Sequence, residues 1–241
     1  MKKPFDLHAD YQPGSFEFTK ANQKRIEEII ALYPKGRQQS AVMPMLDLAQ
    51  RQVGEEGEKA NPPYGGWIPR AAMDKIAEIL GMAPVKVYEV CSFYSMYNMA
   101  PVGQNLVQIC TTTPCWLCGS DELVKTSKKK LGIGMGETTQ DGKFTLVEVE
   151  CLGACVNAPM VQVNDDYYED LTGESMGELI DALAKGEKPK VGSQTGRRGS
   201  MAQSGPVAGF MATAAVAAAA AVFTSAPPAT SFRAVSPWPQ T

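Results

Sequence analysis

The sequence predicts an α+β protein in which a bundle of helices is followed by a smaller domain of mixed strands and helices. Apolar residues first recur at helical spacing in four segments joined by short connections. From Asn105 onward the apolar runs shorten to strand length and alternate with two further helical segments. Two pairs of closely spaced cysteines follow two of the predicted strands. This change of pattern predicts both the fold class and the place of the candidate site.

Composition limits the class of protein. With 44% apolar residues in 241, the chain can bury a substantial core. All 26 acidic residues precede residue 191, whereas the charged residues after it are only Arg197, Arg198 and Arg233. The acidic character of residues 1–190 argues against a nucleic-acid partner. The six cysteines are clustered, which indicates metal binding by thiolates in a reducing compartment and not a disulfide scaffold. Because His8 is the single histidine, a site built on imidazole ligands is not expected.

Four helices are expected after an extended arm at 1–17. Thr19 is the expected N-cap of the first helix and Ser40 of the second, because a hydroxyl can accept a hydrogen bond from the first turn. Gly81 is expected to end the third helix, and the apolar residues of the fourth are Val87, Val90, Phe93 and Tyr97. The predicted helices span 20–33, 41–53, 69–80 and 85–96, with a polar loop at 54–66.

The second part has the predicted order β-α-β-β-α. The acidic stretch 165–170 is expected to be a solvated face or a partner contact. The apolar segment 207–223 consists largely of Ala, which is weakly lipophilic, so a membrane span is not expected there. The predicted strands are 106–110, 144–150 and 159–164, and the helices are 121–131 and 175–184. The predicted domain organisation is an arm at 1–17, a helical bundle at 18–104, a second domain at 105–190 and an Ala/Pro-rich tail at 191–241.

The cysteine pairs are the candidate site. Cys110 and Cys115 form the first pair, and Cys151 and Cys155 form the second. A short spacer lets both sulfurs of a pair face one centre, and four thiolates without a histidine suit a [2Fe–2S] cluster. Structural zinc also binds four thiolates, although it more often uses two-residue spacers, and it stays open as an alternative.

A third interpretation rests on the CxxC at Cys115 and Cys118, which could be a dithiol redox pair at the start of a helix. Cys91, between apolar residues of the fourth predicted helix, is expected to be a core residue. Neither a Ser-His-Asp arrangement nor paired catalytic carboxylates can be recognised, so no residue of this chain is assigned a catalytic role.

Several stretches of the chain carry a family resemblance that covers about residues 15–198. They read Cys110-Thr-Thr-Thr-Pro-Cys115, Glu150-Cys-Leu-Gly-Ala-Cys-Val-Asn-Ala-Pro-Met160 and Tyr167-Tyr-Glu-Asp-Leu-Thr172, and in the helical part Leu46-Asp-Leu-Ala-Gln-Arg51 and Gly66-Trp-Ile-Pro69. These stretches resemble the NuoE-type [2Fe–2S] subunit of the NADH-dehydrogenase module of respiratory complex I. The resemblance implies a thioredoxin-like [2Fe–2S] ferredoxin domain behind the helical bundle.

The resemblance also implies a function. Cys110, Cys115, Cys151 and Cys155 would hold the cluster, and Cys118 would not. The cluster would exchange one electron with the FMN of a flavoprotein subunit that binds FMN and NADH, next to the large iron–sulfur subunit. The expected location is the matrix side of the mitochondrial inner membrane, or alternatively the cytoplasmic face of a bacterial inner membrane. Similar subunits serve NAD-linked hydrogenases and formate dehydrogenases, so a complex of either kind is the alternative to complex I.

Overall fold

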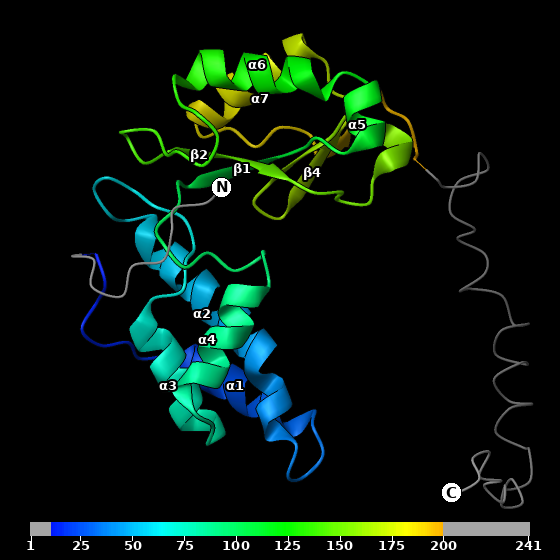
Figure 1. The fold of residues 1–241 in the computed structure, drawn as a ribbon. Coiled ribbons are helices and arrows are strands. Elements are labelled where there is room, and N and C mark those ends of the chain that lie inside the picture. Colours follow the sequence, from blue (N-terminus) through cyan, green and yellow to red (C-terminus); the bar gives the residue numbers. More distant parts are fainter. Residues whose placement is uncertain (1–10, 200–241) are drawn as a thin grey trace, which may run out of the picture. The chain divides into compact units, whose positions relative to one another are not determined.

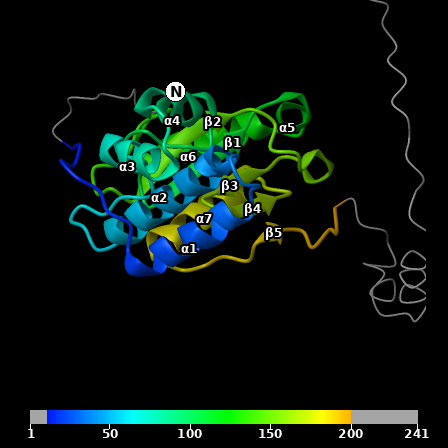
Figure 2. The same cartoon turned by 90° about the horizontal axis from the view of Figure 1, so that it is seen from below.

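A computed structural model describes residues 11–199 of the chain (Figures 1 and 2). The apolar segment expected at 207–223 lies outside the described residues, as do most of the predicted tail and the first ten residues of the predicted arm. Within the described part, no helix combines the length and apolar character needed to cross a membrane.

The N-terminal part contains four helices that share one apolar core. The core takes one face of each helix and includes the fully buried Met45, Leu46, Ile76 and Val87. Such a face of apolar residues at helical spacing is the feature from which the helices were predicted. The helices are α1 (Lys20–Ala31), α2 (Val42–Gly57), α3 (Arg70–Leu80) and α4 (Pro84–Phe93), with the 3₁₀ turn η1 (Gln38–Ala41) before α2.

The predicted helix ends are partly confirmed. The Thr19 hydroxyl accepts a hydrogen bond from the N–H of Asn22, and Gly81 ends α3 with a φ of 60°. The prediction that Ser40 is the N-cap of the second helix was wrong, because Ser40 lies inside η1 and α2 starts without a side-chain cap. Phe93, one of the apolar residues of the fourth predicted helix, is 79% exposed, since it follows the buried Cys91 by two positions and so points to the other side of the helix.

Helix α2 continues into the predicted polar loop. It ends at Gly57, where the chain turns back and Tyr64 donates its backbone N–H to the Gly57 carbonyl over 3.2 Å. A Cβ at position 57 would lie 2.4 Å from atoms of Tyr64, so this close return of the chain requires glycine.

The second part is built on a five-stranded sheet with the order β2-β1-β3-β4-β5, which Figure 2 shows. The β1–β2 and β4–β5 pairs are parallel, whereas β3 is antiparallel to both of its neighbours. The strands are β1 (Asn105–Cys110), β2 (Phe144–Val149), β3 (Val161–Val163), β4 (Asp166–Glu169) and β5 (Gly192–Ser193), and the helices are α5 (Thr113–Leu117), α6 (Ser120–Leu131) and α7 (Gly173–Ala184).

Helices α6 and α7 lie side by side along one face of the sheet (Figure 1). Their apolar residues and those of the strands form a second core, which includes Val107, Leu123, Leu146 and Met176. This arrangement, together with the helical first part, confirms the predicted α+β class.

Apart from the 3₁₀ turns, three short elements were not predicted, namely α5, β4 and β5. The acidic stretch expected to be a solvated face or partner contact contains β4, whose Tyr168 is 3% exposed and pairs with Val161. The sheet extends to β5, beyond the domain boundary predicted at Lys190. The domain boundaries as a whole stay a prediction.

Candidate metal centre

Two neighbouring parallel strands bring the cysteine pairs together. Cys110 is the last residue of β1 and lies opposite Val149, the last residue of β2. Because parallel strands end at the same edge of a sheet, the loop that begins with Cys151 starts beside Cys110. The two pairs are far apart in sequence and meet at this edge.

The first pair is buried. Cys110 and Cys115 are each 1% exposed and pack with Met160 in a small apolar cluster. Burial acts most strongly on Cys110 and would raise its pKa, but hydrogen bonds from Thr112 and from the Leu152 N–H outweigh it and lower the pKa. The Cys110 sulfur lies 3.3 Å from the Thr112 hydroxyl oxygen. Burial and the hydrogen bond that it donates to Cys110 raise the pKa of Cys115.

The second pair is exposed. Cys151 and Cys155 lie in the loop after β2, and their sulfurs are 3.4 Å apart. The N–H of Gly153 and the thiol of Cys155 lower the pKa of Cys151, and donating this bond raises the pKa of Cys155. Gly153 has a φ of 87°, the left-handed conformation that allows the short loop to curl around the sulfur.

The donor set fits a [2Fe–2S] cluster. Each iron of such a cluster takes two thiolates, and the chain presents two pairs of thiols. In both pairs one thiol has a lowered pKa and its partner a raised one, so cluster binding would release protons. Among residues 11–199, no three His, Cys, Asp or Glu side chains are grouped so as to hold a single metal ion.

Backbone N–H groups point at the sulfurs. The N–H of Leu152 acts on Cys110, that of Met160 on Cys115 and that of Gly153 on Cys151. Hydrogen bonds of this kind stabilise negative charge on the sulfurs and tune the potential of a cluster. Only the fold brings Leu152, from the loop after β2, to Cys110 and Met160, the residue before β3, to Cys115. Gly153 acts locally, because it lies in the same loop as Cys151.

The dithiol interpretation is not supported by the geometry. A reactive dithiol needs an accessible thiol of lowered pKa, but Cys115 is buried with a raised pKa. Cys118 is exposed at the end of α5. Cys91 is 1% exposed in the helical core, which confirms its predicted place.

Two residues near the site were not identified from the sequence. Thr112 lies inside the first cysteine motif, and its place two residues after Cys110 was the only signal available. Arg197 donates a hydrogen bond to the carbonyl of Val156, next to Cys155, from 41 residues away in the sequence, and nothing local marks it.

Comparison with known proteins agrees with this geometry. Residues 26–184 match the family described as "Thioredoxin-like [2Fe-2S] ferredoxin". The chain belongs to this family. The [2Fe–2S] cofactor and the thioredoxin-like fold predicted for this ferredoxin-family chain are thereby confirmed.

Two relatives are similar in sequence to this chain over most of its length. The mitochondrial NADH dehydrogenase [ubiquinone] flavoprotein 2 of Dictyostelium discoideum is 55% identical over 183 residues, covering 76% of this chain and 70% of the relative. An NADH-quinone oxidoreductase subunit of Rickettsia bellii is 53% identical over 169 residues, covering 70% of this chain and 95% of the relative. The predicted resemblance to an NADH-dehydrogenase subunit of this type is therefore confirmed.

Among solved structures, a thioredoxin-like [2Fe–2S] ferredoxin from Aquifex aeolicus aligns with 39% of this chain and 96% of its own length, at 21% identity and a TM-score of 0.31.

Proposed function

We propose that this chain is the electron-transfer subunit of an NADH:ubiquinone oxidoreductase, or complex I, and carries one [2Fe–2S] cluster. The observation that carries the proposal is the meeting of two cysteine pairs at the ends of adjacent parallel strands. It occurs in a chain that is more than half identical, over 70–76% of its length, to subunits of NADH dehydrogenases. The bound cluster would supply one-electron transfer, and the chain itself would bind no substrate.

The proposed ligands are Cys110, Cys115, Cys151 and Cys155. The buried pair would keep water from one side of the cluster, since both thiols lie in an apolar cluster with Met160. The exposed pair would leave the other side close to the surface, where a redox partner can approach. The backbone N–H groups of Leu152, Gly153 and Met160 would stabilise the charge on the ligand sulfurs.

The proposed redox partner is a flavoprotein subunit that binds FMN and NADH, with the large iron–sulfur subunit as a further neighbour. Large exposed apolar side chains that follow proposed ligands in the sequence support such a docking surface. Trp116 and Leu117, after Cys115, are 55% and 71% exposed, and Val156, after Cys155, is 56% exposed. Isolated exposed apolar residues are ordinary, but three beside the proposed ligands suit a partner that must come close to the cluster.

We place the complex on the matrix side of the mitochondrial inner membrane, with the cytoplasmic face of a bacterial inner membrane as the alternative. The mitochondrial relative and the bacterial relatives support a complex of this kind. An NAD-linked hydrogenase or formate dehydrogenase is the alternative complex. The respiratory names of the relatives favour complex I over both.

The test is to purify the full chain without air and to measure iron, sulfide, visible absorption and the electron paramagnetic resonance (EPR) signal after reduction. About two irons and two sulfides per chain with a spin-half signal are expected of a [2Fe–2S] protein. A colourless protein with zinc, or with no metal after reconstitution, would refute the proposal. Co-purification of a tagged chain from its source would identify the complex, since hydrogenase or formate dehydrogenase subunits would replace those of complex I.

A further inference from the structure

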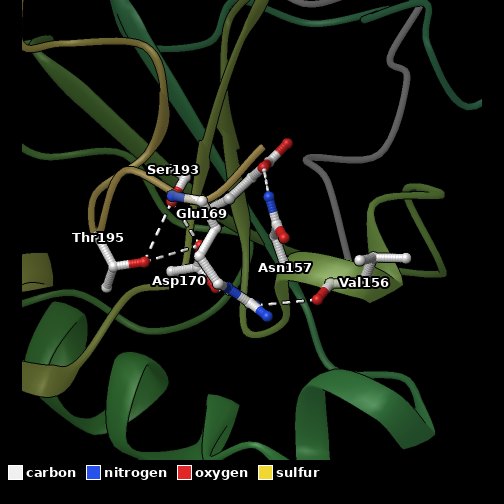
Figure 3. Close-up of polar contacts among 7 residues, drawn as sticks. Val156, Asn157, Glu169, Asp170, Ser193 and Thr195 are labelled. Carbon is white, nitrogen blue, oxygen red and sulfur yellow. Dashed lines mark hydrogen bonds and ion pairs between the residues drawn. The ribbon is translucent and has the colours of Figure 1, made fainter. Parts of the chain in front are cut away.

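The last described segment of the chain reaches back to the second cysteine loop. Arg197 donates from Nη2 to the carbonyl oxygen of Val156 over 2.9 Å, and from Nε to Oδ1 of Asp170 over 3.0 Å (Figure 3). The same Nη2 also contacts Asp170. Because Val156 directly follows Cys155, one guanidinium joins the proposed ligand loop to the end of β4.

Asp170 holds this guanidinium in place. Its side chain is only 6% exposed, and a buried carboxylate is costly unless it is paired and hydrogen-bonded. It accepts hydrogen bonds from Ser193 over 2.5 Å and from Thr195 over 3.2 Å in addition to those from Arg197. The Ser193 hydroxyl in turn accepts from the backbone N–H of Arg197 over 2.9 Å. The contact therefore differs from an ordinary surface ion pair, in which both side chains are solvated.

The ligand loop depends on such contacts. Cys155 and Val156 are exposed, so packing does little to fix them. The next residue, Asn157, is fixed by β4, since its carbonyl accepts from the Asp170 N–H over 2.8 Å and its amide donates to Glu169 over 2.6 Å (Figure 3). The bond from Arg197 holds Val156 from outside the loop.

Resting on the proposed function, we propose that Arg197 is a positioning residue for the cluster. It would fix the Cys155 loop through the Val156 carbonyl and place a positive charge beside the site. A cluster gains negative charge on reduction, so a nearby cation favours the reduced form and raises the reduction potential.

The experiment compares full-length wild type, Arg197→Gln, Arg197→Lys and Arg25→Gln, each loaded with a cluster. Arg25 pairs with Glu28 on the exposed face of α1, so its substitution is a matched charge removal away from the site. The readouts are the midpoint potential from an EPR-monitored redox titration and the rate of iron loss to a chelator.

Arg197→Gln should shift the midpoint to more negative values and lose iron about tenfold faster, the factor expected for one lost charge-assisted hydrogen bond. Arg197→Lys should keep the midpoint near that of wild type, because it keeps the charge, but lose iron faster, because an ammonium cannot make both bonds in the fixed geometry of the guanidinium. Arg25→Gln should match wild type in both readouts.

The inference is overturned if Arg197→Gln matches wild type in midpoint and iron loss, or if Arg25→Gln changes both as much. If Arg197→Gln does not fold, as judged by circular dichroism of the apoprotein, Arg197→Lys decides: iron loss at the wild-type rate overturns the inference. A wild-type chain that binds no [2Fe–2S] cluster would refute the proposed function instead, so the two failures are distinguishable.

Discussion

The two cysteine loops offer the same chemistry in opposite settings. Cys110 and Cys115 are buried and lie on regular structure, the end of β1 and helix α5. Cys151 and Cys155 are exposed and lie on an irregular loop that contains only a short 3₁₀ turn (η2, Cys155–Asn157). The first loop is therefore fixed by packing, and the second by individual hydrogen bonds to distant residues.

This difference separates two properties of the site. Packing around the first pair makes that side of the site part of the protein core, so changes there should affect folding. The cysteines of the second pair are exposed, so replacing them should affect mainly how firmly a cluster is held, whereas the buried Asp170 beside their loop should also affect stability. Variants can test this difference, beginning with the proposed ligands.

The largest effect is expected from Cys110→Ser and Cys151→Ser, which should each reduce bound iron from about two per chain to nearly none. Cys118→Ser, as the matched control, should keep both irons. The variants of these two proposed ligands should differ as apoproteins. The buried hydroxyl in Cys110→Ser should cost about 1–3 kcal/mol of unfolding free energy, whereas the exposed Cys151→Ser should change it by less than about 0.5 kcal/mol. Equal apoprotein stabilities in urea would contradict the comparison.

Met160→Ala should come next. Met160 is 1% exposed and packs against the first cysteine pair, so its truncation should leave a cavity and cost about 2–5 kcal/mol. The control is Leu152→Ala in the second loop, where the side chain is only partly buried. This variant should lose clearly less unfolding free energy than Met160→Ala. Urea unfolding of the two apoproteins tests this, and a Leu152→Ala cost as large as that of Met160→Ala would argue against it.

Acid should weaken the second loop through Asp170. Burial raises the pKa of this carboxyl, but bonds from Arg197 and from the Ser193 and Thr195 hydroxyls outweigh it, so its pKa lies below the ordinary value. Its contribution to stability is therefore complete above the pKa of the unfolded chain's carboxyl and is lost as pH falls through the lower folded value. Asp170→Asn should cost about 1.5–3 kcal/mol at pH 7 in urea unfolding of the apoprotein, and the difference from wild type should shrink toward pH 3. A difference that stays constant with pH would contradict this.

Tyr167→Phe should have a smaller effect. It removes a 2.8 Å hydrogen bond to the Leu152 carbonyl in the second loop, which is worth about 1 kcal/mol. Tyr97→Phe removes a comparable 2.9 Å bond to the Met43 carbonyl in the helical part. Both variants should lose similar stability, but only Tyr167→Phe should release iron faster to a chelator. Faster release from Tyr97→Phe as well would mean that global stability, and not the loop, controls retention.

The smallest effect is expected from Thr112→Val at the first pair. It removes the hydroxyl 3.3 Å from the Cys110 sulfur without a large change of volume. Losing a weak bond that stabilises negative charge should lower the midpoint potential by roughly 20–40 mV, the equivalent of about 0.5–1 kcal/mol for one electron. Thr111→Val is the control, because the Thr111 hydroxyl bonds Glu148 and not a sulfur. Equal shifts of the midpoint potential in both variants would show that the Thr112 hydroxyl has no specific effect on it.

Much of the fold could be predicted because its signals are local. The helical periods, the Thr19 cap and the Gly81 stop are each contained within a few residues, and the structure places α1, α3 and α6 close to their expected bounds. The elements that were missed are short. Strand β4 has four residues and begins with an acidic one, so its local pattern suggests a solvated loop, and only pairing with β3 makes it a strand.

The chemistry of this protein follows from its sequence alone, because two pairs of closely spaced cysteines without a suitable histidine specify the type of ligand. Which pair is buried, which N–H groups of other elements reach the sulfurs and which distant residues hold the second loop all depend on tertiary structure. Arg197 and Asp170 show the reason. Their contact spans 27 residues, and the bond from Arg197 to Val156 spans 41, so neither leaves a periodic or local trace in the sequence. They meet because β5 pairs with β4 and carries the last described residues back to the end of that strand.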